Sequence, residues 1–106
     1  MDSKFIYLDC DISAGMFSGE CVFELELSSG ERYSGFAPRH YCRKPNGQPL
    51  PAGTPRERQT IKGKIAARLI RNGGDVAYVA IPDGEAVEVP AGIISPREPE
   101  TSHVPV

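Results

Sequence analysis

Apolar and polar side chains alternate in three segments of the first third of the chain, residues 5–12, 20–28 and 31–37. A period of two places successive side chains on opposite faces, which is typical of a strand with one buried face. The predicted buried positions of the first two segments are Ile6, Leu8, Cys10, Ile12, Cys21, Phe23, Leu25 and Leu27. Ser29 and Gly30 supply turn residues between the second and third segments, so we predict a β-hairpin there.

A different composition follows in residues 43–55, which contain four prolines and two glycines. Proline lacks the backbone N–H that helices and strand ladders use, so this stretch favours neither. We predict a long, stiff surface loop. Loops of this length inside compact domains are often functional.

Residues 61–71 fit two different periods. Ile61, Ile65 and Leu69 are spaced for one face of a helix, and they equally occupy one side of a strand. The opposite side of that strand carries Lys62, Lys64 and Arg68. A turn sequence at 72–75 and the apolar run 76–81 behind it favour a strand that pairs back across the turn, with Ile65 in the core.

The last third of the chain predicts short elements. Residues 76–81 are apolar on both faces, as in a buried strand, and a turn at 82–85 separates them from a short strand at 86–89. Residues 91–94 are expected to form a single helical turn. From Ser95 onward, three prolines and the lack of apolar periodicity predict a disordered tail.

Five to six short strands joined by tight turns are typical of a small antiparallel barrel. The 106 residues correspond to the size of one domain. We therefore predict an all-β fold, an SH3-like or OB-like barrel with a long proline-rich loop, formed by one domain over residues 1–94 with the tail over residues 95–106. The alternative is an open sheet capped by a helix over residues 61–71.

The predicted hairpin, residues 22–35, resembles the first motif of the Sm-like RNA-binding barrels. That motif combines an alternating strand, a turn glycine and a second glycine five positions later, which Gly30 and Gly35 match. The Asp and Asn that contact a base in that family correspond here to Tyr41 and Pro45. The family's later Ile-Arg-Gly signature is also absent, so the resemblance implies the small-barrel fold and transfers no RNA-contacting residue.

Composition and cysteine usage bear on the class of protein. No segment approaches the roughly 20 apolar residues of a membrane-spanning helix, and Asp2 does not fit the basic start of a signal peptide. Cys10, Cys21 and Cys42 are odd in number and widely spaced, which indicates reduced, buried thiols. We expect a cytoplasmic protein.

His40 and Cys42 are the nearest approach to catalytic or metal-binding chemistry. With Cys10 and Cys21 they form a Cys3His set, but structural zinc sites typically use cysteine pairs two to four residues apart. A Cys42 nucleophile activated by His40 would make a small hydrolase or redox protein, although no third, orienting group is visible. We expect a non-enzymatic protein without metal or cofactor.

The net charge of −2 conceals an uneven distribution. Residues 32–71 hold ten of the twelve lysines and arginines and one acid, a net charge of +9. Residues 1–31 carry −6, and residues 72–106 carry −5. Such asymmetry indicates either an anion-binding face or acidic and basic strands that neutralise each other.

Aromatic rings accompany the cations of this basic segment. Cations that follow a phosphate backbone, beside rings that stack on bases, are typical of single-stranded nucleic-acid sites on small barrels. The candidate binding residues are Arg39, Tyr41, Arg43, Lys44, Arg56, Arg58, Lys62, Lys64 and Arg68. We therefore predict a module that binds RNA, single-stranded DNA or another polyanion.

A protein–protein interaction module, or a subunit of a larger assembly, is the alternative function. In that case the cations of residues 61–71 pair across strands with Glu24, Glu26 or Glu88 and are not available to a ligand. The proline-rich loop and the apolar residues Met16, Phe17 and Leu50 would then contact a partner protein or a second copy.

Overall fold

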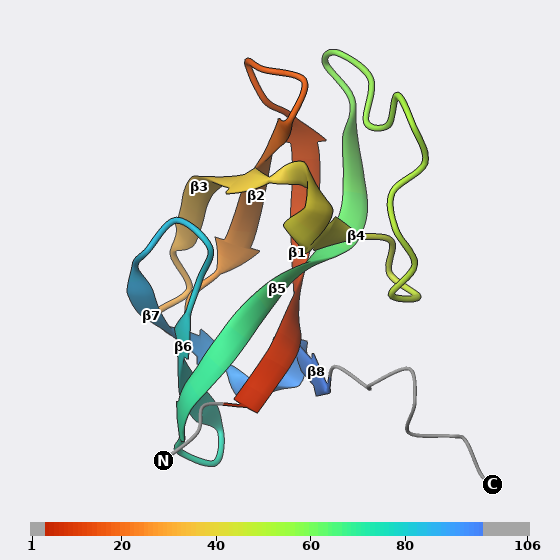
Figure 1. The fold of residues 1–106 in the computed structure, drawn as a ribbon. Coiled ribbons are helices and arrows are strands. Elements are labelled where there is room, and N and C mark those ends of the chain that lie inside the picture. Colours follow the sequence, from red (N-terminus) through yellow and green to blue (C-terminus); the bar gives the residue numbers. More distant parts are fainter. Residues whose placement is uncertain (1–3, 97–106) are drawn as a thin grey trace, which may run out of the picture.

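The computed structural model describes residues 4–96, which form an all-β fold (Figure 1). The strands are β1 (Lys4–Ala14), β2 (Glu20–Glu26), β3 (Arg32–Pro38), β4 (Cys42–Arg43), β5 (Thr60–Asn72), β6 (Val76–Ala80), β7 (Ala86–Pro90) and β8 (Ile94–Pro96). Two 3-10 turns, η1 (Arg39–Tyr41) and η2 (Ala91–Ile93), precede β4 and β8. In this part of the chain no helix is long and apolar enough to span a bilayer.

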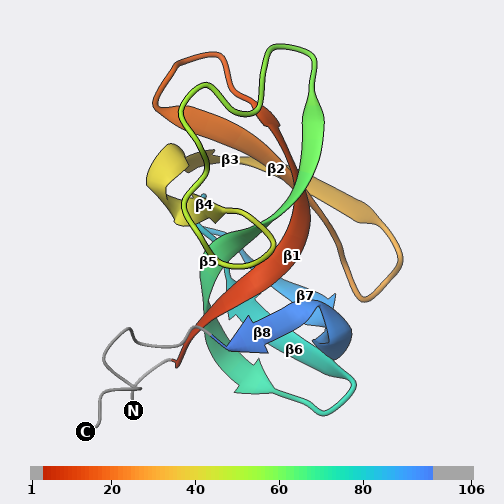
Figure 2. The ribbon, with the colours of Figure 1, turned by 90° about the vertical axis from the view of Figure 1, so that its right-hand side faces the viewer.

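The strands form one antiparallel sheet with the order β3-β2-β1-β5-β6-β7. The short strands lie off this path, β4 against β5 and β8 against β1. Figure 2 shows how strongly the long strands β1 and β5 coil, so that the sheet curls into a half-barrel around its core. The expected antiparallel all-β fold is therefore confirmed at this level.

The alternation in β1 and β2 correctly predicts the core. Its predicted positions Ile6, Leu8, Cys10, Ile12, Cys21, Phe23 and Leu25 are all buried, and Leu27 packs against them from just beyond β2. They meet Ile65, Ala67, Val79 and Val89 from the other half of the sheet in one hydrophobic cluster. The core is thus built from inward-facing residues of strands distant in sequence.

Residues 61–71 belong to strand β5, so the helical alternative is wrong. Ile65 is fully buried, as the strand interpretation requires. On one side β5 pairs with β1 from Lys4↔Leu69 to Ser13↔Thr60, and on the other it pairs with β6. A register shift follows Leu69 in the pairing with β6.

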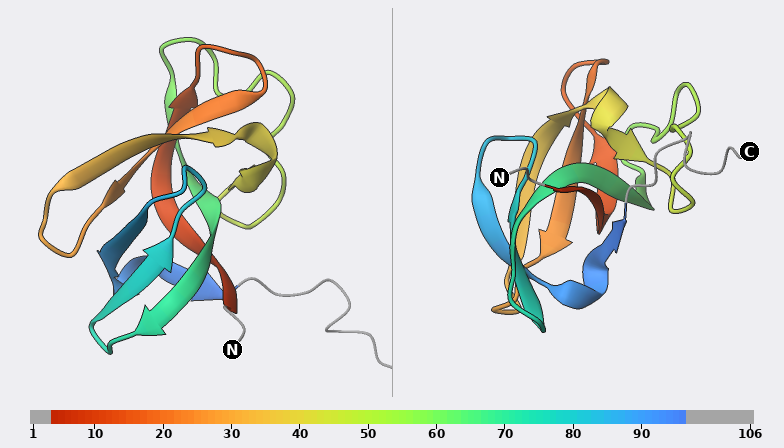
Figure 3. Two further views of the ribbon diagram at one scale, coloured as in Figure 1. Left: turned by 60° about the vertical axis from the view of Figure 1, so that its left-hand side comes forward. Right: turned by 60° about the horizontal axis from the view of Figure 1, so that its bottom comes forward.

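The ends of the half-barrel are joined by contacts between the β2–β3 hairpin and the β6–β7 hairpin (Figure 3). The Tyr33 hydroxyl donates to Asp83 Oδ2 at 2.6 Å, and the Ser28 amide donates to the Glu88 carbonyl at 3.0 Å. The Asp83 hydrogen bond, with burial, raises the pKa of Tyr33 to about 12. A Cβ on Gly35 would lie 2.5 Å from Asp83 Oδ2, so the bare glycine backbone permits this approach.

The sequence pattern does not reveal the two shortest strands, β4 and β8. Ser95 and Pro96, predicted to begin a disordered tail, instead belong to β8 and lie opposite Tyr7 and Ile6 of β1. A three-residue strand that contains proline has too few positions to show a period, and only its pairing with β1 defines it. The rest of the expected tail, residues 97–106, lies outside the described residues.

Candidate functional site

The pairing of β1 with β5 divides the outer face of the sheet into a charged half and an aromatic half. The opposed pairs are Asp11 with Lys62, Asp9 with Lys64, Tyr7 with Ala66, and Phe5 with Arg68. Because directly opposed residues on one face contact each other, this register decides which cations meet a carboxylate.

Carboxylates neutralise the cations of the charged half. Lys62 Nζ lies 2.9 Å from Asp11 Oδ1, and Lys64 Nζ lies 3.4 Å from Asp9 Oδ1. Arg32 Nη2 contacts the other oxygen of Asp11 at 2.7 Å. The hydrogen bond from Lys62, followed by that from Arg32, holds the pKa of Asp11 below its ordinary value.

Of the three cations predicted on the outer side of this strand, Lys62 and Lys64 are therefore paired, but not with the predicted carboxylates. The expected partners were Glu24, Glu26 or Glu88, whereas the actual partners of Lys62 and Lys64 lie on β1. The error arises because strand pairing, which the sequence pattern leaves undefined, brings β1 rather than β2 or β7 against β5.

Arg68 differs from the two lysines. It is exposed, and among the residues from 4 to 96 it forms no ion pair. The residue opposite it on β1 is Phe5, which offers an aromatic ring in place of a carboxylate. The positive charge of Arg68 is thus available at the surface.

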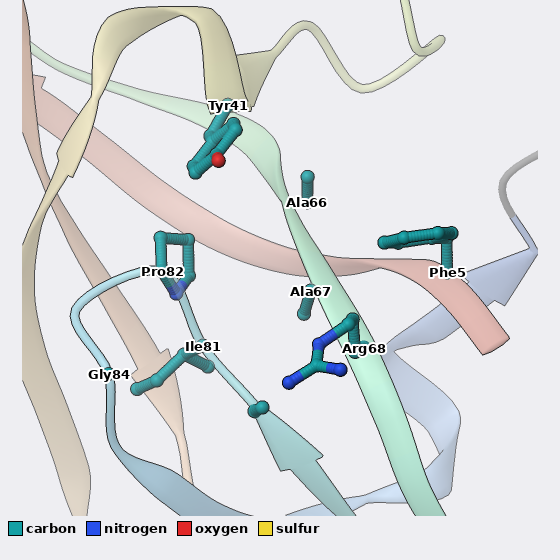
Figure 4. Close-up of a pocket in the computed structure, with 9 residues that line it drawn as sticks. Phe5, Tyr41, Ala66, Ala67, Arg68, Ile81, Pro82 and Gly84 are labelled. Atoms are coloured by element: carbon teal, nitrogen blue, oxygen red, sulfur yellow. The ribbon is translucent and has the colours of Figure 1, made fainter. Parts of the chain in front are cut away.

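Arg68 lies at the edge of a hollow of about 440 Å³, which we call the β5 hollow (Figure 4). Its lining includes Phe5 from β1, Tyr41 from η1, Ala66, Ala67 and Arg68 from β5, and Ala80, Ile81, Pro82 and Gly84 from β6 and the turn after it. In Figure 4, Tyr41 and Arg68 stand on opposite sides, with Ala66 and Ala67 between them. The rings of Phe5 and Tyr41 are 57% and 39% exposed.

The β5 hollow forms at a gap between β4 and β6, which pair with different parts of the same edge of β5. The pairing with β4 reaches Ile65, and the pairing with β6 begins at Arg68. Ala66 and Ala67 lie between these two ladders, where the neighbouring chain is the 3-10 turn η1 on one side and Ile81 and Pro82 on the other. The side chain of Ala66, on the outer face of β5, is small, which leaves the hollow open.

The other predicted binding residues lie on η1, β4 and the segment 44–59. Arg39 is half-buried and donates from Nη2 to the Pro51 carbonyl at 2.6 Å, so it holds this segment against the fold. Arg43 is half-buried in β4. Lys44, Arg56 and Arg58 are exposed between β4 and β5. None of these cations lines the β5 hollow, so the nine candidates do not form one cluster.

The cysteines are buried thiols. Cys42 is 1% exposed, and burial together with the neighbouring Cys21 raises its pKa to about 12. Burial likewise raises the pKa of Cys10. A thiol of this kind stays protonated at neutral pH, which argues against the Cys42 nucleophile. Within the described part of the chain, no cluster of His, Cys, Asp and Glu is arranged to hold a metal ion.

Sequence reasoning identified Tyr41 and Arg68 but missed the other residues of the β5 hollow. Phe5 carried a usable signal, because the alternation places this large aromatic residue on the outer face of its strand. Ala66 and Pro82 carried none. They matter only because β4 and β6 separate beside them, which depends on pairing between distant segments.

Comparison with known proteins gives no further assignment: no model of a protein family, no curated protein and no solved structure matches this chain. The chemistry of the site itself is therefore the basis for assigning a function.

Proposed function

We propose that this chain is a non-enzymatic binding module, a small barrel of the SH3-like or OB-like kind, whose ligand is single-stranded RNA or DNA. The observation that carries the proposal is the β5 hollow, where Arg68, which has no ion pair among residues 4–96, stands beside the exposed residues Phe5 and Tyr41. Single-stranded nucleic acids present phosphates and flat bases in alternation, and a cation next to aromatic rings matches both.

Further cations follow Tyr41 along the chain. Tyr41 ends η1, and the chain continues through Arg43 and Lys44 into the segment that carries Arg56 and Arg58. These cations are the candidates for contacts with the neighbouring phosphates of a nucleic acid that has a base at Tyr41. Lys62 and Lys64 are left out of the proposed surface because Asp11 and Asp9 already neutralise them.

Binding to a mixed-sequence single-stranded oligonucleotide is expected to weaken steeply as salt rises, because cations that contact phosphates release counterions. Arg68→Ala and Tyr41→Ala are each expected to weaken binding about tenfold, by loss of a phosphate contact and of a stacking ring. Fluorescence anisotropy at several salt concentrations measures both effects.

Lys62→Ala is the matched control, since it removes an exposed cation of the same strand that is paired with Asp11. We expect its affinity to stay within about twofold of the wild type, because exposed ion pairs contribute little. No detectable binding at low salt would contradict the proposal. Equal losses for Lys62→Ala and Arg68→Ala would instead indicate attraction by overall charge, without a defined site.

A second candidate function, self-association, rests on the exposed apolar side chains beside β3. Met16, Phe17 and Phe36 are 84%, 69% and 53% exposed, and Phe17 and Phe36 line one surface depression with Pro38. β3 is the terminal strand of the sheet, so a second copy is able to pair with it edge to edge and cover the rings. Leu50, the third apolar residue of the predicted partner contact, is half-buried and packs against the core.

Replacing Phe17 by Ser is expected to abolish self-association if β3 forms a dimer interface, because it removes a large exposed apolar contact. Sedimentation velocity over a range of protein concentrations gives the oligomeric state. Tyr78→Ser, at an exposed aromatic position on β6, is the control and leaves a β3 dimer intact. A wild-type protein that stays monomeric at every concentration contradicts this second function.

A further inference from the structure

We propose that the β5 hollow takes one unpaired nucleobase, which stacks on Tyr41 while a hydrogen-bond donor on its edge meets the Ala66 carbonyl, a group to which neither β4 nor β6 brings a donor. This inference rests on the proposed function and specifies which part of the nucleic acid enters the site. It assigns the base to the hollow and the phosphate to Arg68 at the rim.

A peptide carbonyl of β5 lacks a partner because β4 and β6 pair with different parts of the same edge of β5 and leave a gap between them. Successive residues of an antiparallel strand direct their N–H and C=O groups to opposite edges. One residue of the pair Ala66 and Ala67 therefore points these groups toward β1, and the other points them into the gap. The registers of the β2–β3, β1–β2 and β1–β5 pairs make Ala66 the residue that points into the gap. The pairing of Cys42 with Ile65 directs the Ala66 N–H to the Tyr41 carbonyl, so the Ala66 C=O is the group to which neither ladder brings a donor within residues 4–96.

The residues opposite the gap explain why it stays open. Continued by one residue, the register of β4 would bring Tyr41 opposite Ala66, but Tyr41 belongs to the 3-10 turn η1. Continued by two residues, the register of β6 would bring Pro82 opposite Ala66, and proline has no N–H to donate. The Ala66 C=O at the floor of the hollow is therefore left as a hydrogen-bond acceptor.

A carbonyl acceptor discriminates among the parts of a nucleotide, because it binds only a group that has a hydrogen-bond donor. Phosphate oxygens only accept hydrogen bonds, whereas the edges of the bases present donors and acceptors together. A base is also the part of the nucleotide that stacks on an aromatic ring. The carbonyl at the floor and the Tyr41 ring at the wall of the β5 hollow therefore both select the base.

The size of the hollow and the place of Arg68 agree with this orientation. Its volume of about 440 Å³ lies within the range of ligand pockets, and the Ala66 methyl group leaves the space above β5 open. The Arg68 side chain stands across the hollow from Tyr41 (Figure 4). The phosphate of a base stacked on Tyr41 therefore lies on the side of Arg68, which pairs with no carboxylate of residues 4–96.

The test compares a single-stranded oligothymidylate with an abasic strand of the same length, both by fluorescence anisotropy. We expect the wild type to bind oligothymidylate at least about tenfold more tightly than the abasic strand, since one stacked base contributes about that factor. Ala66→Leu fills the hollow without a change in charge. It is expected to weaken only the binding of oligothymidylate, so that the oligothymidylate and the abasic strand bind with similar affinity.

Ala86→Leu is the control, because it makes the same change at an exposed position of β7 outside the hollow. It is expected to preserve the preference. Thermal unfolding verifies that each variant is folded. If Ala66→Leu does not fold, Tyr41→Ala replaces it in the test: Tyr41 is exposed, and its loss is expected to abolish the preference for oligothymidylate in the same way.

An oligonucleotide with difluorotoluene in place of thymine tests the Ala66 carbonyl separately, since this ring stacks but forms only weak hydrogen bonds. We expect it to bind at least about fivefold more weakly than thymine, because the Ala66 C=O is then left unsatisfied. Equal affinity for both rings overturns the hydrogen-bonding role. Equal wild-type affinity for the thymidylate and abasic strands overturns the base pocket but leaves salt-dependent binding intact, whereas no binding to either strand overturns the proposed function as well.

Discussion

Replacing Ile65 by Ala is expected to lower the free energy of unfolding by about 2 to 5 kcal/mol. Ile65 is fully buried at the centre of β5, between Leu8 of β1 and Cys42 of β4. With paired strands on both sides, the backbone has little freedom to move inward and fill the space that the smaller side chain leaves. Urea denaturation followed by circular dichroism measures the loss.

Ile70→Ala in the same strand is the matched control. Ile70 is 52% exposed, so its truncation opens no enclosed cavity. We expect a change within about 0.5 kcal/mol, as for other surface positions. Similar losses for the two variants would contradict the assignment of Ile65 to the core and of Ile70 to the surface.

The second large effect is expected at Gly63, where Gly63→Ala should lower the free energy of unfolding by about 1 to 3 kcal/mol. A Cβ there would lie 2.6 Å from the Arg43 carbonyl oxygen and 2.5 Å from Ile12 Cδ1. The Ile12 side chain can rotate, but the Arg43 carbonyl belongs to β4, so β4 must shift away from β5. Chemical denaturation again gives the size of the effect.

Gly19→Ala separates this steric effect from the general cost of replacing a glycine. A Cβ on Gly19 would have no atom within 4 Å, and its backbone does not adopt a positive φ. We expect Gly19→Ala to be neutral or slightly stabilising, because alanine restricts the unfolded chain. A neutral Gly63→Ala would show that β4 does not pack on β5 as closely as described.

The sequence predicts the strands with a buried face and leaves their neighbours undetermined. Alternation identifies the core positions of β1 and β2, and the turn at 72–75 correctly selects a strand for residues 61–71. The sequence does not predict β4 and β8, because strands of two or three residues are too short to show a period. The sequence also does not predict that Asp9 and Asp11 pair with the β5 lysines, because the register between β1 and β5 joins segments about fifty residues apart.

The candidate site was predictable in its residue types but not in its shape. Arg68 and Tyr41 stand out in the sequence as a cation and a ring in a basic segment. Their meeting at one hollow depends on η1 turning away from β5 and on β6 ending before Pro82. These are properties of three-dimensional packing, and a pattern along one strand contains no information about them.

The pairing of β1 also determines the speed and order of folding. This first strand takes its partners from residues 21–24, 60–69 and 94–96, so most of its ladder closes large loops of chain. Folding rates fall as the sequence separation of contacts grows, which places this domain among the slower small proteins, on the scale of milliseconds to seconds. During synthesis, the β1 ladder stays incomplete until residue 96 has left the ribosome, although the β2–β3 hairpin is able to form much earlier.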